Sequence, residues 1–176
     1  MPSDEELIRA FVGGSRDALG TLAHRYECKL LDLSQAILGS PDLAADAVQE
    51  TWLRVVRYAH SFNGRSSAKT WLYRIAINQC RSVLSARPWV SQEPDQAAPD
   101  VSSEPSQTAA IRDETERLKQ AVERLSPPLR ETVLLCYTHQ LTHEEAAEAM
   151  GVPIGTAKSR LHAALESLRK QLGAAR

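Results

Sequence analysis

Long apolar runs are missing from this sequence of 176 residues. No stretch approaches the about eighteen consecutive apolar residues that identify a membrane-spanning helix. The amino terminus, MPSDEELIRAF, is acidic where a secretory signal would be basic and then apolar. We therefore expect neither membrane insertion nor export, and we expect the protein to act in the cytoplasm.

The sequence has only three cysteines, and their spacing matches no paired-cysteine motif. Cys28, Cys80 and Cys136 lie far apart, and no C-x-x-C pair is present. This spacing excludes a zinc or dithiol motif. An unpaired cysteine behaves as a small hydrophobic residue, so we expect free, buried thiols.

Motifs for catalysis are also missing. The sequence has no Gly-rich phosphate loop, no nucleophile elbow and no recognisable Ser/His/Asp set. His139 and His143 flank an expected helix start at Thr142, so the two rings should not share a helix face. We expect no enzyme activity, no metal, no cofactor and no small-molecule substrate.

Acidic residues are missing from one long window. Positions 51–92 hold none, whereas the whole-chain frequency of 22 in 176 would place about five there. The window contains seven basic residues: Arg54, Arg57, Arg65, Lys69, Arg74, Arg81 and Arg87. Six aromatic residues lie among or beside them: Trp52, Tyr58, Phe62, Trp71, Tyr73 and Trp89. This combination is typical of single-stranded nucleic-acid binding, although each ring taken singly also fits a core position.

Helical signals fill the chain on both sides of one segment, and they predict an all-α fold. We expect an N-terminal helical bundle with helices near 4–12, 16–38, 42–60 and 67–86. Its start signals are a capping box formed by Ser3 and Glu6, the pair Ser40-Pro41, and Ser66 or Ser67.

The segment 88–111 is rich in Pro and Ser, with four acidic residues and no basic one. Its composition predicts a flexible linker between domain 1–87 and domain 112–176. Four helices are expected in the second domain: Ser126 should cap the second, and Thr142 with Glu145 should form a capping box on the third. Gly151 should then end that third helix.

The last two helices have the pattern of a helix-turn-helix. Ala147 is small at the expected crossing, and Gly151 permits a tight turn. The N-terminal residues of the second helix of such a unit meet DNA. The candidates are Thr156, Lys158, Ser159, Arg160 and His162. A solvated basic face is the plain alternative.

The segment DLAADAVQETWLRVVR carries a mixed polar and apolar face. Such a face suits a protein partner, although an ordinary solvated surface fits the pattern equally well. Its members are Asp46, Gln49, Glu50, Leu53, Arg54 and Arg57.

Three stretches resemble, in this order, the extracytoplasmic-function sigma factors, which are two-domain bacterial initiation factors. They are AADAVQETWLRVVR, FNGRSSAKTWLYRIAINQCRSVL and RLSPPLRETVLLCYTHQLTHEEAAEAMGVPIGTAKSRLHAALESLR. The resemblance implies that residues 1–87 bind core RNA polymerase and the melted −10 promoter element. It implies that residues 112–176 bind the −35 element as duplex, and that an anti-sigma factor regulates the protein.

The family's functional residues are carried over by position. Core polymerase binding is implied for Asp46, Gln49, Glu50, Leu53 and Arg54. Binding of the melted strand is implied for Phe62, Asn63, Gly64, Arg65, Ser66, Ser67, Lys69, Trp71, Arg74 and Asn78. The five helix-turn-helix candidates, from Thr156 to His162, would contact the upstream duplex.

The sequence departs from the family pattern at three positions. Ala163 and Leu165 occupy places where many relatives carry arginine. The resemblance therefore leaves open how this chain contacts phosphates and bases of the upstream element. Ile77 replaces a residue that is commonly basic, so we expect weaker contact with the melted strand there. The alternative function is an autonomous helix-turn-helix regulator that binds duplex DNA without polymerase.

Overall fold

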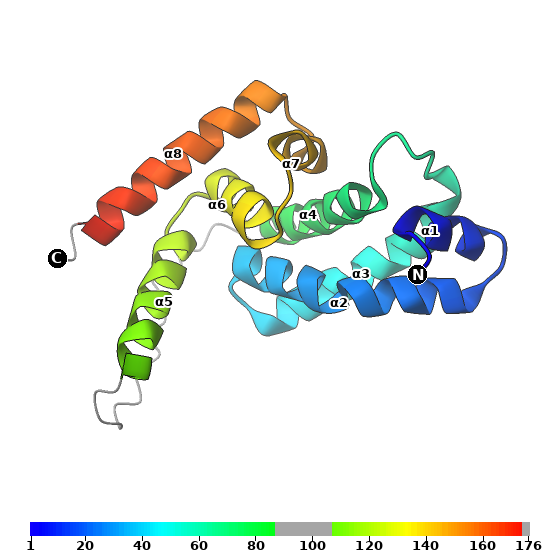
Figure 1. The fold of residues 1–176 in the computed structure, drawn as a ribbon, viewed down its shortest axis with the longest axis horizontal. Helices are drawn as coiled ribbons and strands as arrows, with labels where there is room; N and C mark the ends of the chain where they lie inside the picture. Colours follow the sequence, from blue (N-terminus) through cyan, green and yellow to red (C-terminus); the bar gives the residue numbers. More distant parts are fainter. Residues whose placement is uncertain (87–106, 174–176) are drawn as a thin grey trace.

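The computed structural model describes residues 1–86 and 107–173, and within these ranges the chain is helical without strands (Figure 1). None of the described helices is long and apolar enough to cross a bilayer. The N-terminal domain consists of α1 (Asp4–Val12), α2 (Arg16–Leu38), α3 (Pro41–Tyr58), the short 3-10 helix η1 (Ala59–Ser61) and α4 (Ala68–Ala86). The C-terminal domain consists of α5 (Gln107–Glu123), α6 (Pro127–Val133), the π-helical turn η2 (Leu134–Thr138), α7 (His143–Met150) and α8 (Ile154–Gly173). The all-α prediction is therefore confirmed.

The expected start signals define the N-terminal helices. Ser3 Oγ accepts the Glu6 N–H at 3.2 Å, and Glu6 Oε2 accepts the Ser3 N–H at 2.8 Å, which completes the capping box. Ser40 Oγ accepts the N–H of Leu43 at the start of α3. Of the two serines proposed before α4, Ser67 is the one whose hydroxyl caps the first turn, because it accepts the Thr70 N–H at 3.1 Å.

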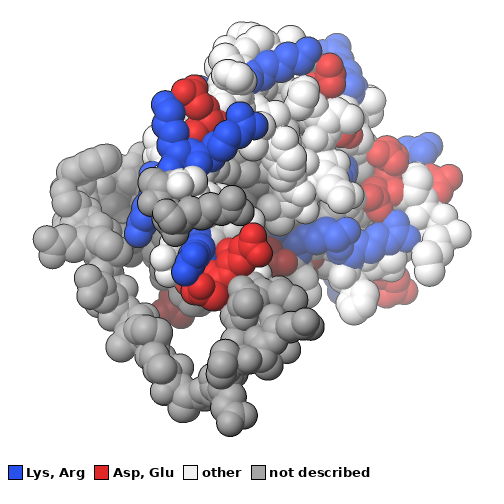
Figure 2. Space-filling model, turned by 60° about the vertical axis from the view of Figure 1, so that its left-hand side comes forward, with Lys and Arg blue, Asp and Glu red and all other residues white. Residues whose placement is uncertain are grey.

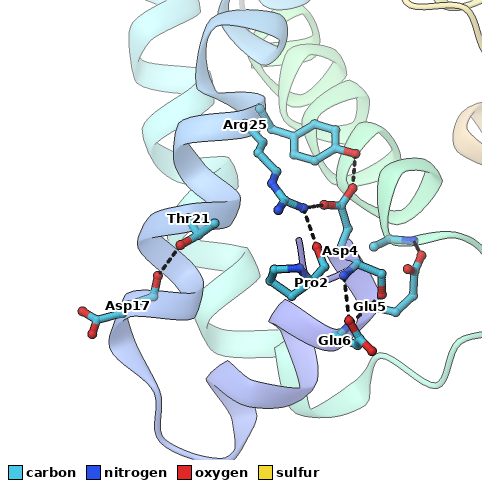
Figure 3. A network of polar contacts seen from close by, with 10 residues as sticks. Pro2, Asp4, Glu5, Glu6, Asp17, Thr21 and Arg25 are labelled. Atoms are coloured by element: carbon cyan, nitrogen blue, oxygen red, sulfur yellow. Dashed lines mark hydrogen bonds and ion pairs between the residues drawn. The ribbon is translucent and has the colours of Figure 1, made fainter.

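Contacts from α1 fix the start of α4 (Figure 3). Asp4 in α1 is held by Arg25 of α2, whose Nη1 lies 2.6 Å from Asp4 Oδ1, and by the hydroxyl of Tyr26. The next residue, Glu5, accepts the N–H of Ala68 at 2.9 Å with its Oε1. This hydrogen bond is the largest cause of the lowered pKa of Glu5. The loop that precedes α4 is thereby held against α1.

Local signals also set the C-terminal helices. Thr142 and Glu145 form the expected capping box, and Gly151 takes the left-handed conformation with φ of 68° at the end of α7. Ser126 occupies the N-cap position of α6, but its hydroxyl accepts no hydrogen bond from the first turn, so that part of the prediction is wrong. The helix expected after Ser126 is α-helical only to Val133, where it continues into the π-helical turn η2.

One hydrophobic core extends through both domains. It includes Leu30 and Leu72 of the N-terminal helices together with Leu135 and Met150 of the C-terminal domain. Helix α4 lies between α3 on one side and α7 on the other. A smaller core joins α5, α6 and α8. The sequence predicted two domains on a tether, and the structure adds an extensive contact between them.

The thiols are free but not uniformly buried. Cys80 is buried, and burial raises the pKa of its thiol. Cys136 is half-buried, whereas Cys28 is exposed on α2. The expectation of buried thiols is thus wrong for Cys28, because that position lies on the solvent face of an amphipathic helix.

Candidate nucleic-acid and protein interfaces

A groove of about 390 Å³ runs between α2 and α3. Its lining is mainly apolar and includes Leu31, Val48, Trp52, Leu53 and Val56. Leu53 is 55% exposed and Val56 is 49% exposed, which is unusual for large apolar side chains on the same helix. This surface has the chemistry of a protein-binding site, with an apolar centre available for burial.

Of the residues predicted for polymerase binding, some line this groove and others lie beside it on α3. Gln49 and Leu53 line it, and Asp46 is exposed one turn earlier on α3. Glu50 forms an ion pair with Arg54, with Oε1 and Nε 3.1 Å apart. Arg54 itself lines a different pocket, on another face of α3.

That second pocket lies between α3 and α4 and has a volume of about 270 Å³. Trp71, Arg74 and Asn78 of α4 contribute to it, together with Arg54 and Tyr58 of α3. Among the residues that the structure describes, no acidic side chain lines it. Two rings, two guanidinium groups and the amides of Asn78 and Gln79 thus line one open pocket, a combination that suits single-stranded nucleic-acid binding.

The loop before α4 presents further polar groups beside this pocket. Trp71 touches Phe62, with ring centroids 5.3 Å apart and planes inclined by 50°. Asn63 Oδ1 accepts the Arg65 N–H at 3.1 Å, and Gly64 adopts a φ of 71° that favours glycine. Trp71 therefore borders both the loop and the pocket. The residues predicted to bind the melted strand are thus divided between the loop before α4 and the adjacent pocket.

Lys69 is engaged elsewhere. Its Nζ donates to the carbonyl oxygen of His139 at 2.9 Å and to that of Gln140 at 3.3 Å, both in the C-terminal domain. Gln140 has a φ of 52°, a conformation uncommon for a residue other than glycine. Lys69 thus stabilises a contact between the domains in this arrangement, and a DNA phosphate would have to compete for it.

The same face of α4 continues the contact between the domains. Tyr73 Oη and His139 Nδ1 lie 3.0 Å apart. Two turns further, Arg81 donates to both carboxylate oxygens of Glu131, and its Nη1 donates to the Met150 carbonyl oxygen at 2.9 Å. Ile77 lies one turn from both positions and is fully buried. A basic side chain there would be buried in the core, so Ile77 bears on packing in this arrangement and offers the melted strand no surface.

Burial dominates the electrostatics of His139. It lowers the pKa of the imidazole to about 4, with smaller contributions from Lys69 and Lys29, while Asp32 acts in the opposite direction. His139 Nε2 has no hydrogen-bond partner within the described part of the chain. The ring is therefore neutral at pH 7. A charged imidazole is unfavourable at this buried position, so protonation of His139 would weaken the contact between the domains. Nowhere in the described ranges do three potential metal ligands come together, around His139 or elsewhere.

Helix α8 carries the helix-turn-helix candidates. Lys158, Ser159 and His162 are exposed, while Thr156 and Arg160 are half-buried. Figure 2, in which the left-hand side of Figure 1 comes forward, shows basic side chains over the upper part of this face and across its middle, with acidic ones among them. The helix packs against α5, α6 and α7, and the outer face of its N-terminal part, with Lys158, Ser159 and His162, stays exposed. Figure 1 shows how α8 lies along this edge of the C-terminal domain.

The two departures on α8 differ in their surroundings. Ala163 is exposed, whereas Leu165 packs against the smaller core. An arginine at residue 165 would have to leave that core to reach DNA. Of the two positions, only Ala163 is exposed, so only there does the absence of an arginine remove a basic group from the surface.

Sequence reasoning did not assign Tyr58 or Glu131 to any site. Tyr58 stands among the aromatic residues of the acid-free window, but nothing in its spacing showed that it would meet α4. Glu131 is a buried acid next to an apolar run, and only the fold reveals that Arg81 is its partner.

Comparison with known families matches both domains. Residues 22–90 match the family described as Sigma-70 region 2, and residues 115–168 match Sigma-70, region 4. The RNA polymerase sigma-H factor of Pseudomonas aeruginosa is 31% identical over 180 residues, which cover 96% of this chain and 93% of that protein. The ECF RNA polymerase sigma-E factor of Haemophilus influenzae is 30% identical over 182 residues, which cover 97% and 95%.

Solved structures agree over nearly the whole chain. CnrH in complex with the cytosolic domain of CnrY has a TM-score of 0.75 at 21% identity, covering 98% of this chain and 99% of that one. RpoE in complex with the anti-sigma factor NepR from Bartonella quintana has a TM-score of 0.69 at 27% identity, covering 89% and 98%. Sigma factors direct RNA polymerase to promoters and catalyse no reaction themselves. The chain belongs to the sigma-70 family, as a sigma factor of the extracytoplasmic-function type with region 2 and region 4 domains.

Proposed function

We propose that residues 1–87 bind core RNA polymerase through the groove between α2 and α3. The residues that we assign to this contact are Asp46, Gln49, Glu50, Leu53 and Arg54. The observation that carries the assignment is the apolar lining of the groove beside Leu53, which is 55% exposed. Burial of such a side chain in an interface contributes about 1.5–3 kcal/mol. Charged groups at the edge of the groove would orient the partner.

The same domain would capture the melted promoter strand on another face. We assign this contact to the loop and the start of α4: Phe62, Asn63, Gly64, Arg65, Ser66, Ser67, Lys69, Trp71, Arg74 and Asn78. The acid-free sequence window 51–92 and the exposed Arg65, Arg74 and Asn78 support the assignment. Unstacking a base costs a few kcal/mol, which stacking and phosphate contacts at this surface would offset.

Residues 112–176 would bind the upstream duplex through the N-terminal part of α8. The contact residues are Thr156, Lys158, Ser159, Arg160 and His162. Exposed basic and hydroxyl groups at a helix N-terminus suit phosphate and base edges in a major groove. The expected linker, residues 88–111, would let the two domains reach two promoter elements. Its residues 88–106 lie outside the described part of the chain, and α5 already begins at Gln107.

An anti-sigma factor is the proposed inhibitory partner, and the proposed site of action is the cytoplasm, where core polymerase is found. RpoE, which is 27% identical to this chain, was solved in complex with the anti-sigma factor NepR. The fold of RpoE in that complex is similar over 89% of this chain, with a TM-score of 0.69, and this supports the proposal. A partner that favours this arrangement would hold the two domains together and away from the polymerase.

Run-off transcription from a randomised promoter pool, with core RNA polymerase in the presence and absence of the protein, tests this function. We expect specific transcripts only when the protein is present, and their sequences would define both promoter elements. Tight duplex binding by the protein alone, without added transcripts, would instead indicate the autonomous regulator.

A further inference from the structure

We propose that Glu5 of α1 is a positioning residue for the loop of residues 62–67, and that it thereby determines how selectively this loop binds the melted strand. The inference rests on the proposed function of the N-terminal domain, which assigns the loop to that strand. Glu5 itself would not touch DNA. It would act through the hydrogen bond that its carboxylate accepts from Ala68, the first residue of α4.

The first turn of α4 needs acceptors from outside the helix. The first N–H groups of any helix lack partners within it, and side-chain oxygens commonly accept them. Two oxygens share this task here: Ser67 Oγ accepts the Thr70 N–H at 3.1 Å, and Glu5 Oε1 accepts the Ala68 N–H at 2.9 Å. Ser67 is local, whereas Glu5 lies 63 positions earlier in the chain. The start of α4 is therefore tied to α1 as well as to its own loop.

A carboxylate suits this position. Ala68 is fully buried and Glu5 is half-buried, so loss of the Glu5 side chain would leave a buried N–H without its acceptor. A negative charge at the N-terminus of a helix is also stabilised by the helix dipole. The hydrogen bond from Ala68 lowers the pKa of Glu5, which keeps the carboxylate ionised at neutral pH.

Helix α1 supports both ends of the loop. It contacts the turn η1, after which the loop begins at Phe62, and it contacts α4, at which the loop ends. Asp4 fixes α1 in turn, because it is bound by Arg25 and by the hydroxyl of Tyr26, both on α2 (Figure 3). The place of the loop on the bundle is thus defined through α1.

Contacts inside the loop shape it without fixing its place. Asn63 Oδ1 accepts the Arg65 N–H at 3.1 Å, and Gly64 has a φ of 71°. All three residues are exposed. Selection of one base by hydrogen bonds requires donors and acceptors within about 3.5 Å of each other. A small displacement of the loop would therefore reduce its preference for one base over the others.

The sign of the effect separates positioning from electrostatics. An acidic side chain near bound DNA repels the phosphates, so loss of its charge alone should strengthen binding of the strand. Loss of the hydrogen bond to Ala68 should weaken binding instead. Glu5→Ala removes both the charge and the acceptor. Glu5→Gln removes the charge and keeps a side-chain oxygen that can accept the N–H.

The test uses holoenzyme reconstituted from core RNA polymerase and the full chain. The probes are single-stranded fragments that carry the melted element found by run-off selection, with every base tried at each position. The position bound by the loop is the one where Asn63→Ala changes the base preference. We expect Glu5→Ala to bind the preferred fragment about fivefold more weakly and to lose a similar factor of preference at that position. Glu5→Gln should keep the preference of the wild type.

Glu6→Ala is the matched control. It removes the same charge from the next residue of α1, but the contact that it loses is with the Ser3 N–H at the start of α1. Its base preference should equal that of the wild type. Hydrogen exchange of residues 62–71, measured by mass spectrometry, checks the intermediate step: exchange should be faster in Glu5→Ala and unchanged in Glu6→Ala. Circular dichroism should be the same for all variants.

Three results would overturn the proposal. They are unchanged or tighter binding by Glu5→Ala, weaker binding with the base preference of the wild type, and an equal loss of preference in Glu6→Ala. Each of them, obtained while Asn63→Ala still alters one position, rejects the role of Glu5 alone. If Asn63→Ala alters no position, the assignment of the loop to the melted strand fails, and the role of Glu5 fails with it.

Discussion

Arg81 of α4 and Glu131 of α6 join the two domains through a two-point contact. Arg81 Nη2 lies 2.6 Å from Glu131 Oε2, and Arg81 Nε lies 3.1 Å from Oε1. The Glu131 side chain is only 3% exposed, whereas that of Arg81 is 35% exposed. The guanidinium group thus satisfies a carboxylate that water does not reach.

Loss of Arg81 should destabilise the contact between the two domains. Arg81→Met leaves the Glu131 carboxylate buried without its partner, which should cost on the order of 2 kcal/mol of unfolding free energy. Urea denaturation measures the change. The double variant Arg81→Met/Glu131→Leu should recover most of the loss, since it removes the buried charge. A double variant as unstable as the single one would contradict this explanation.

Acidification should weaken the protein through His139. Its pKa is about 4 in the folded chain against 6.5 when it is free, so the unfolded chain binds a proton first as the pH falls. The contribution of the neutral His139 to the free energy of unfolding is therefore fully present above pH 6.5 and is lost as the pH falls to about 4. Between pH 7 and pH 5 the loss should be about 2 kcal/mol.

Urea denaturation at these two pH values measures the loss. His139→Gln can still pair with the Tyr73 hydroxyl but does not titrate, so its stability should change much less between them. An equal pH dependence in the variant would assign the effect to other groups.

The groove between α2 and α3 should decide polymerase affinity. Glu50→Arg with Leu53→Ala removes an exposed apolar side chain and reverses a charge, which should weaken core binding by about a hundredfold or more. Both side chains point outward, so circular dichroism should be unchanged. Val12→Ala, which truncates a side chain that is 51% exposed on α1, is the matched control and should bind normally. Normal affinity of the double variant would remove this groove from the interface.

The start of α8 should carry the salt dependence of duplex binding. Lys158→Ala with Arg160→Ala should reduce the slope of log affinity against log salt by about 2 if both side chains meet phosphates. Arg169→Ala with Lys170→Ala makes the same change of charge on the same helix, roughly 16 Å further along. This control should alter the slope much less. Equal effects of the two pairs would show a diffuse attraction instead of a reading helix.

The helices were predictable because their start signals are local. The capping boxes of Ser3 with Glu6 and of Thr142 with Glu145 involve residues three apart, and the structure forms both. Gly151 ends α7 for an equally local reason, since its left-handed conformation favours glycine. Ser126 shows the limit of such signals, because the residue type and position are right and the hydrogen bond is absent.

Contacts between distant segments were not predictable in the same way. Tyr73 and His139 are separated by 66 positions, and neither has a local feature that selects the other. The pocket lined by Tyr58 likewise depends on the turn η1, which brings the end of α3 beside α4. The sequence indicated the kinds of side chain needed for single-stranded DNA, and the fold determined which of them meet.

The contact of Lys69 with the carbonyl groups of His139 and Gln140 has a consequence for apparent affinity. If Lys69 binds DNA as proposed, only molecules in which its ammonium group is released from the carbonyl groups can do so, and the observed dissociation constant equals the intrinsic one divided by the released fraction. A ligand that binds only molecules with Lys69 released shifts the population toward them. By reciprocity, any substitution that loosens the contact raises the affinity for that ligand. On that proposal, the stability of the contact between the two domains would set the concentration of the protein at which promoter binding begins.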